Sequence, residues 1–444
     1  MYRSPNDCIR QLFTICFPLF TGLFFISLFI ILISCSSRDK EVTVIKFWAM
    51  GTEAEYVTKL VPEFEKQNPG ITVDVQQIPW NAAQEKLVTA FASDNTPDIC
   101  QLGNTWIPQF SSLNAIIRLD DFIAESKVIK KKNYFAGVWD TNIMDSSVYG
   151  IPWYIDTRIM FYRADIFREA GYENPPRTWH ELKELCKKIK ALYPGKDKYA
   201  IYLPTNEWNP FIIFALENGA TLLKDNNSRG NFSSQKFKEA FNFLTNFHRE
   251  KLAPLGISQV TNVYQAFVEE YFSIYISGPW NINEFKKWMT GDMANKWSTA
   301  PMPSKAEDHY PGVSLAGGSS LVIFKDSKHK DESWKFIEYL SQTSTQLEFY
   351  HLLYNLPAVK EAWKDSSLAN NKYMKAFREQ FENVVATPKV PEWEQIAFAK
   401  VQQYAEIVIR GALTVDQALA DLDKDVDKIL EKRRWLLSRE KEKE

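Results

Sequence analysis

The sequence predicts an α/β fold divided into two domains. With 444 residues, the chain is longer than one compact core usually supports. Strand-like and helix-like patterns alternate from about residue 41 to residue 430. Such alternation is typical of mainly parallel sheets covered by helices on both faces.

The first strand–helix–strand unit begins near residue 41. Residues 41–48 (EVTVIKFW) and 71–78 (ITVDVQQI) alternate their side chains in the period of a strand. Between them, apolar residues recur at helical spacing from Val57 to Phe64, and the turn sequence Asn68-Pro69-Gly70 ends the helix. We therefore expect a βαβ unit at the start of the first domain.

The same pattern continues along the chain. Thr178 with Glu181, and Thr414 with Gln417, have the spacing of capping boxes at helix starts. Further strands are expected at residues 199–203, 272–276 and 321–324.

The N-terminal segment predicts export. Arg3 and Arg10 precede an apolar run from residue 12 to residue 33. The run ends in Leu-Ile-Ser-Cys, which resembles the lipobox of bacterial lipoproteins, so residues 1–34 are predicted to be a signal peptide and Cys35 the lipidated cysteine. Residues 35–40 would then be a polar tether. Because the apolar run is long enough to span a bilayer, an uncleaved membrane anchor is the alternative. Either way, we expect a membrane-anchored, extracytoplasmic protein.

Composition and motifs argue against several functions. A net charge of −2 gives no field for holding nucleic acid. The histidines are scattered without a metal-ligand spacing, and neither a phosphate-binding glycine loop nor a nucleophile elbow occurs. We therefore expect no metal, no cofactor and no catalytic residue. Cys100 and Cys186 are expected to be unpaired buried thiols, although a disulfide between them is possible in an oxidising compartment.

The positions of the tryptophans indicate a binding site. Several stand at or just beyond the end of an expected strand, or in a loop among polar residues, where open α/β sheets bind their ligands. Indole faces beside carboxylates and amides suit a ligand with flat apolar faces and a polar rim, as sugars have. For any single tryptophan, a role as a core plug is the alternative. The five are Trp48, Trp106, Trp208, Trp280 and Trp393.

Seven segments, in order, resemble the solute-binding proteins of bacterial ABC importers, in particular the carbohydrate-binding family that includes maltose- and trehalose-binding proteins. This resemblance implies a periplasmic-binding-protein-like type II fold, with two lobes and a ligand cleft between them. It also implies a monomer that delivers a sugar, di- or oligosaccharide, to ABC permease subunits without breaking a bond. The segments begin at residues 44 (VIKFWAMG), 93 (SDNTPDIC), 149 (YGIPWYID), 175 (PPRTWHEL), 275 (YISGPWNI), 314 (SLAGGSSL) and 390 (VPEWEQIA).

The resemblance also implies the ligand-binding residues. Family members often carry an acid near the position of Gly103-Asn104, and its absence here puts one hydroxyl contact in doubt. Carried over onto this chain, the set is Trp48, Gly51, Glu53, Asn104 and Trp106 in the first lobe; Tyr154, Asp156 and Arg158 at the crossing; Trp208, Asn209, Trp280 and Trp393 in the second lobe; and Gly317 and Gly318, where backbone amides could approach the ligand.

Asp156 is a candidate on chemical grounds as well. A carboxylate can accept two hydroxyl donors in charge-assisted hydrogen bonds. Arg158 lies two residues further along an extended segment and shares its face, so an ion pair between the two is the alternative. For Arg158 itself, structural pairing and ligand contact are both open.

The chain is expected to pass between the lobes more than once. We predict lobe 1 at residues 41–155 plus 305–355, lobe 2 at 156–304 plus 356–435, and a charged tail at 436–444. Three other functions stay open: a receptor for a different polar solute such as glycerol phosphate, a sensor that signals without transport, and a glycosidase that uses Asp156 and Glu53.

Overall fold

The structure is a computed structural model that describes residues 42–256 and 260–441. The expected signal peptide, the lipidation site at Cys35 and the tether lie outside these residues, as does the end of the charged tail. Within the described ranges, no helix combines the length and the apolar character needed to cross a bilayer. Cys100 and Cys186 are buried, unpaired thiols in separate clusters of the core.

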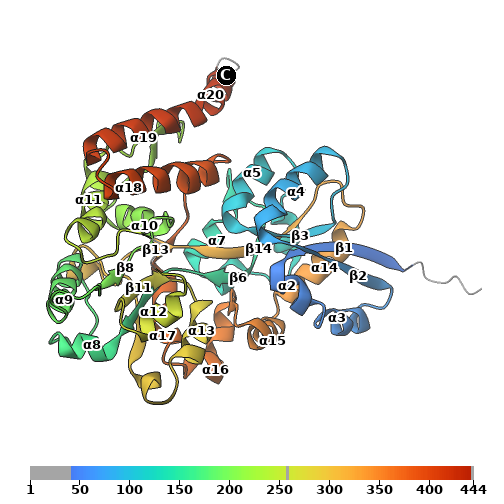
Figure 1. Cartoon of the computed structure of the whole chain (residues 1–444). Coiled ribbons are helices and arrows are strands. Elements are labelled where there is room, and N and C mark those ends of the chain that lie inside the picture. Colours follow the sequence, from blue (N-terminus) through green and yellow to red (C-terminus); the bar gives the residue numbers. More distant parts are fainter. Residues whose placement is uncertain (1–41, 257–259, 442–444) are drawn as a thin grey trace, which may run out of the picture.

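Two sheets organise the molecule, one on each side of a narrow waist (Figure 1). We call the elements around the six-stranded sheet the first lobe and those around the four-stranded sheet the second lobe. In spatial order, the first sheet contains β15 (Leu356–Pro357), β6 (Ile151–Asp156), β14 (Gly317–Ile323), β3 (Ile99–Gly103), β1 (Thr43–Met50) and β2 (Ile71–Ile78). The second contains β12 (Trp297–Ala300), β7 (Ile159–Arg163), β11 (Ile274–Ser277) and β8 (Ile201–Tyr202).

The first sheet buries both of its faces, because successive side chains of a strand point to opposite sides. On one side of β1, Phe47 packs edge-on against Phe336 at 5.7 Å between ring centroids. On the other side, Trp48 and Met50 share a buried cluster with Leu87 of the helix that follows β2. The helices of this lobe are α2 (Gly51–Val57), α3 (Val61–Gln67), α4 (Trp80–Ala92), α5 (Ile107–Ser112), α6 (Asp120–Glu125), α7 (Ala136–Asp140), α14 (Lys330–Leu340) and α15 (Thr343–Leu353).

The second lobe is richer in helices. Its largest buried cluster joins strands β7, β8 and β11 to helices on the outside of the sheet. The helices of this lobe are α8 (Ala164–Glu169), α9 (Trp179–Ala191), α10 (Asn209–Glu217), α11 (Gln235–Arg249), α12 (Val263–Val268), α13 (Asn281–Trp288), α16 (Ser366–Ala369), α17 (Met374–Gln380), α18 (Gln402–Ile409), α19 (Val415–Ile429) and α20 (Glu431–Lys441).

Segments from three parts of the described chain pass through the waist and bond to one another. The Thr157 hydroxyl, between β6 and β7, donates to the carbonyl of Leu315 at 2.8 Å. Leu315 ends β13 (Ser314–Leu315), which pairs in parallel with β16 (Val384–Val385). Figure 1 shows β14 running from this junction across the middle of the molecule into the first sheet. The lobes therefore meet at a hydrogen-bonded junction of crossing segments.

The expectation of mainly parallel sheets is wrong. Among the strand pairs of the two sheets, β1–β2, β1–β3 and β8–β11 are parallel, whereas the pairs made by β6, β7, β12, β14 and β15 are antiparallel. The antiparallel strands are those next to the passages between the lobes. Strands β7 and β14 enter their sheets from the other lobe and not through a βαβ crossover. They are therefore not required to run parallel to their neighbours.

The local expectations agree better with the structure. Strand β2 has the expected bounds, and β1, β8, β11 and β14 overlap the expected strands. Both capping boxes are present, at the starts of α9 and α19. The predicted lobe boundaries stay predictions; β15 pairs with β6 just beyond residue 355, and α17 then packs against β7 and β12.

His248 is expected to make the stability of the fold depend on pH. It is 2% exposed near the end of α11, and its Nδ1 lies 2.8 Å from the carbonyl oxygen of Pro254. Burial lowers the pKa of His248 from 6.5 to about 4, although the hydrogen bond to Pro254 opposes the shift. Between pH 6.5 and about 4, His248 is therefore protonated in the unfolded chain and neutral in the folded chain. Stability should fall as the pH drops from 6.5 towards 4, by about 3 kcal/mol at most from this group.

Urea unfolding at pH 7 and at pH 4.5 measures this effect. His248→Asn, which retains a donor for Pro254, should reduce the loss of unfolding free energy between the two pH values. The same loss in both proteins would show that His248 is not the group responsible.

Candidate functional site

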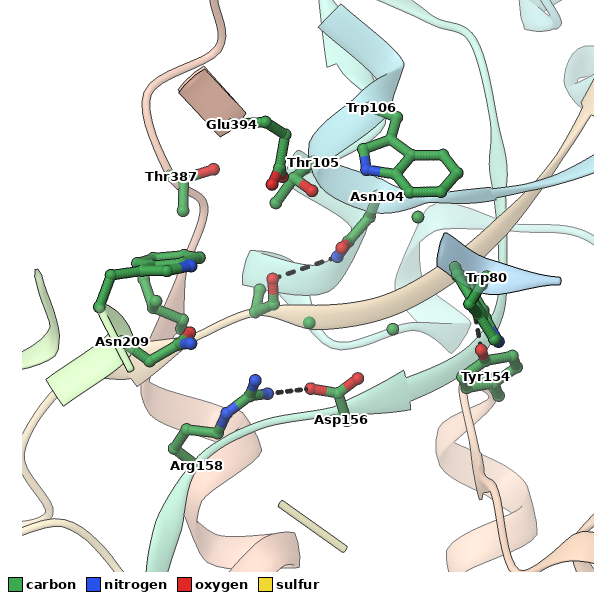
Figure 2. A pocket seen from close by; sticks show the side chains of 17 residues that line it. Trp80, Asn104, Thr105, Trp106, Tyr154, Asp156, Arg158, Asn209, Thr387 and Glu394 are labelled. Atoms are coloured by element: carbon green, nitrogen blue, oxygen red, sulfur yellow. Dashed lines mark hydrogen bonds and ion pairs between the residues drawn. The ribbon is translucent and has the colours of Figure 1, made fainter. Parts of the chain in front are cut away.

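A cavity of about 290 Å³ lies between the two lobes. This volume is at the lower end of the range for small-molecule pockets, roughly 300–1,000 Å³. Figure 2 shows side chains from both lobes and from the waist around the same space. Nine residues expected from the sequence line it: Asn104, Trp106, Tyr154, Asp156, Arg158, Trp208, Asn209, Gly317 and Gly318.

The two lobes present tryptophan to the cavity in the same local way. Trp106 is the residue before α5 and Trp208 the residue before α10, and each helix has a proline in its first turn. Proline suits the start of a helix, because its missing N–H is not needed there. The short helix turn η1 (Asn104–Trp106) after β3 also brings Asn104 to the cavity, where its amide donates to the Ala316 carbonyl at 3.1 Å.

Asp156 and Arg158 form an ion pair at the floor of the cavity. Arg158 Nη1 donates to Asp156 Oδ1 at 2.7 Å, and both side chains are about one-fifth exposed. Burial raises the pKa of the Asp156 carboxyl, and the Arg158 guanidinium partly opposes that rise. The guanidinium carbon also lies 4.7 Å from the ring centroid of Trp280. The ion pair, which the sequence left open as the alternative to ligand contact, is thus present, and it engages one of the two carboxylate oxygens.

Tyr154 lies in a buried network of hydrogen bonds beside the cavity. Its hydroxyl accepts from Gln101 Nε2 at 3.1 Å and from Ser319 Oγ at 3.0 Å. Burial raises the pKa of Tyr154, and the nearby carboxylate of Glu53 raises it further, while the hydrogen bond from Ser319 opposes the rise. The hydroxyl therefore keeps its proton at neutral pH.

Gly317 and Gly318 allow β14 to lie close to β6. A Cβ on Gly317 would stand 2.2 Å from Asp156 Oδ1, and one on Gly318 would stand 2.2 Å from the Tyr154 carbonyl oxygen. Gly318 also has φ +118°, a conformation that other residues rarely adopt. Although both glycines line the cavity, they are already required by the contact between the two strands.

The structure places five expected residues outside the lining. Trp48 is 8% exposed and faces α4. Trp393 is fully buried and meets Trp208 edge-on at 6.0 Å between ring centroids. Gly51 lies against Trp80, Glu53 stands beside Gly51, and Trp280 is half exposed beside Arg158. The positions of Trp48 and Trp393 are those of packing residues, and a role in ligand contact stays a prediction for all five.

Eight lining residues were not expected from the sequence. Trp80 follows strand β2 by two residues, so the rule that selected the other tryptophans could have found it. Glu394 follows Trp393 directly and had no signal of its own; burial raises its pKa, and a hydrogen bond with the Thr105 side chain opposes the rise. The eight are Trp80, Gly103, Thr105, Leu315, Ala316, Ser319, Thr387 and Glu394.

The charge of the lining favours a neutral or cationic ligand. Among the described residues that line the cavity, Arg158 is the one Arg or Lys, against the carboxylates of Asp156 and Glu394. The net charge is −1 when all three are ionised. Indole faces, amides and charged acceptors together can hold a molecule with many hydroxyl groups and flat apolar faces. In the described part of the chain, no group of three or more His, Cys, Asp or Glu side chains could hold a metal ion.

Gly317→Ala should destabilise the protein by about 1–3 kcal/mol, because the added Cβ meets Asp156 at the floor of the cavity. Gly103→Ala is the matched control: its Cβ would be 3.4 Å from Trp106, an ordinary contact. That variant should keep or gain stability, by up to about 1 kcal/mol, since alanine restricts the unfolded chain. Urea unfolding measures both. Equal stability of the two variants would contradict the close approach of β14 to β6.

Comparisons with known proteins agree with this architecture. The family described as bacterial extracellular solute-binding protein matches residues 51–347. A putative binding protein of Brucella abortus (strain 2308) is 27% identical over 392 residues, which cover 86% of this chain and 93% of that protein.

Two solved structures are similar over nearly their whole length. The sugar-binding protein MalE from Xanthomonas citri is 48% identical with a TM-score of 0.86, covering 89% of this chain and 99% of that one. An ABC transporter solute-binding protein from Thermotoga lettingae, bound with α-D-tagatose, is 26% identical with a TM-score of 0.71, covering 87% and 100%. The two-lobed α/β fold expected from the sequence is thus confirmed.

Proposed function

Because this chain belongs to the family of bacterial extracellular solute-binding proteins, we propose that it is the sugar receptor of an ABC importer. The ligand is a di- or oligosaccharide held in the cavity between the lobes. The observation that carries this proposal is the lining itself: indoles from both lobes, with a charged acceptor, Asp156, on the floor between them. The similarity to the sugar-binding protein MalE supports the same ligand class.

A sugar fits the chemistry of these side chains. Its C–H faces can lie against Trp106 and Trp208, while its hydroxyls donate to Asp156 and Glu394. Tyr154 and the amides of Asn104 and Asn209 add polar groups that orient the rings. An anionic solute such as glycerol phosphate fits less well, because Arg158 is already paired with Asp156.

The position of the cavity also suits a receptor that closes on its ligand. A solute that contacts both lobes binds the closed form better than the open form, and this difference in affinity drives closure about the waist. The closed receptor then delivers the sugar to the permease subunits. No step in this cycle breaks a bond of the solute, so the protein acts as a receptor and not as an enzyme.

Sugar binding is tested by thermal shift and titration calorimetry on the soluble chain that starts after Arg38. Saccharides and polyol phosphates are screened first; a ligand at 100 times its Kd should stabilise the fold by about 2.7 kcal/mol. If no sugar stabilises the protein and a phosphate ester does, the proposal fails.

Asp156→Asn then tests the site. Losing a charge-assisted hydrogen bond should weaken sugar binding about 10- to 150-fold, which corresponds to about 1.5–3 kcal/mol. Asp74→Asn, which removes an exposed carboxylate of β2, is the control and should bind like the unchanged protein. If the unchanged protein, Asp156→Asn and Asp74→Asn bind the sugar with equal affinity, Asp156 does not contact the ligand.

We further propose that Cys35 is acylated and that the receptor is a monomer tethered to the membrane surface. The support is the sequence Leu-Ile-Ser-Cys directly after the apolar run. Cys35→Ala should leave an unprocessed chain that still carries residues 1–34, which intact-mass measurement of the membrane fraction detects. A variant processed like the unchanged protein would contradict lipidation at Cys35.

A further inference from the structure

Trp80 lines the cavity and lies above Tyr154 in Figure 2. Its indole rests on Gly51, whose φ is +50°. The point that a Cβ of Gly51 would occupy is 3.0 Å from Trp80 Cδ1 and 3.2 Å from Trp80 Nε1. A side chain on Gly51 would therefore press on the indole and shift it by a few tenths of an ångström.

The carboxylate of Glu53 stands against the same glycine. Its Oε2 is 3.3 Å from the same Cβ point of Gly51, so Glu53 and Trp80 both stand against this glycine. Glu53 is only 9% exposed; Asn355 Nδ2 donates to its Oε1 at 3.2 Å, and the Tyr154 hydroxyl also hydrogen-bonds to this carboxylate. A carboxylate offers about four acceptor sites on its two oxygens. Keeping a charged group away from water is costly unless it is hydrogen-bonded, so Glu53 is well suited to take further donors.

Trp80 is less enclosed than the tryptophans of the core. It is the first residue of α4, its side chain is 38% exposed, and it meets Trp106 edge-on at 5.7 Å between ring centroids. By contrast, Trp153 and Trp393 are almost fully buried. Rotation of Trp80 towards solvent would uncover Gly51 and Glu53 without opening the core.

We propose that Trp80 is a length-selecting gate at the end of the sugar cleft. A short sugar ends against the indole. A longer one turns the indole aside, and the hydroxyls of its next ring then donate to Glu53. This inference rests on the proposed sugar-binding function and adds to it the residue that decides how many rings the cleft accepts.

Titration calorimetry with trehalose, maltose, maltotriose and maltotetraose tests the gate. Trp80→Ala should shift the affinity ratio between the tri- and disaccharide at least about tenfold in favour of the trisaccharide, because no indole has to be displaced. Adding Glu53→Gln to Trp80→Ala should return the ratio to within about threefold of its starting value, since the acceptor of the extra ring is weakened.

Two further variants keep the test decisive. Glu53→Gln alone should weaken the trisaccharide more than the disaccharide, and this result does not depend on how well Trp80→Ala folds. Trp106→Ala, which removes the other indole of the edge-on pair, is the control; it should weaken both sugars by a similar factor and leave their ratio unchanged.

The failures are distinguishable. If Trp80→Ala weakens short and long sugars equally, Trp80 is a fixed stacking surface and the gate is overturned, while the sugar receptor stands. If Glu53→Gln affects both sugars equally or neither, Glu53 is not the acceptor of the extra ring and the gate is likewise overturned. If the folded, unchanged protein binds none of the four sugars, the gate for these sugars fails, and the wider saccharide screen decides the receptor separately.

Discussion

The close approach of β14 to β6 is the constraint on which the rest of the site depends. Gly317 and Gly318 let the two strands pair where any side chain would strike Asp156 or the backbone of Tyr154. This pairing ends at the waist, where the crossing segments bond to one another through Thr157, Ser314 and Ala316. The floor of the cavity and the junction of the lobes are therefore the same piece of structure.

This arrangement links binding to closure. Asp156 is the last residue of β6 in the first lobe, and its partner Arg158 directly precedes β7 of the second lobe. A ligand that bonds to Asp156 from the cavity thus acts beside the point about which the lobes would turn. Burial raises the pKa of this carboxyl, so it gives up part of its hydration in the folded protein, and hydroxyl donors from a ligand would replace that hydration.

Much of this could be predicted from the sequence, because it depends on local patterns. Alternating apolar residues predicted strands β1 and β2, and the two-residue spacing of Asp156 and Arg158 allowed an ion pair as the alternative to ligand contact. The rule that tryptophans at strand ends form the site was less exact, since it could not say which face of β1 carries Trp48. Strand direction and the position of Glu394 depend on contacts between distant segments, which no local pattern encodes.

The central claim is that a sugar lies on Asp156 between the two lobes. A crystal structure of the protein with the saccharide that stabilises it most tests this directly. We expect sugar hydroxyls within hydrogen-bonding distance of the Asp156 carboxylate and a ring face against Trp106 or Trp208. A sugar bound elsewhere on the protein, with this cavity holding only water, would contradict the account.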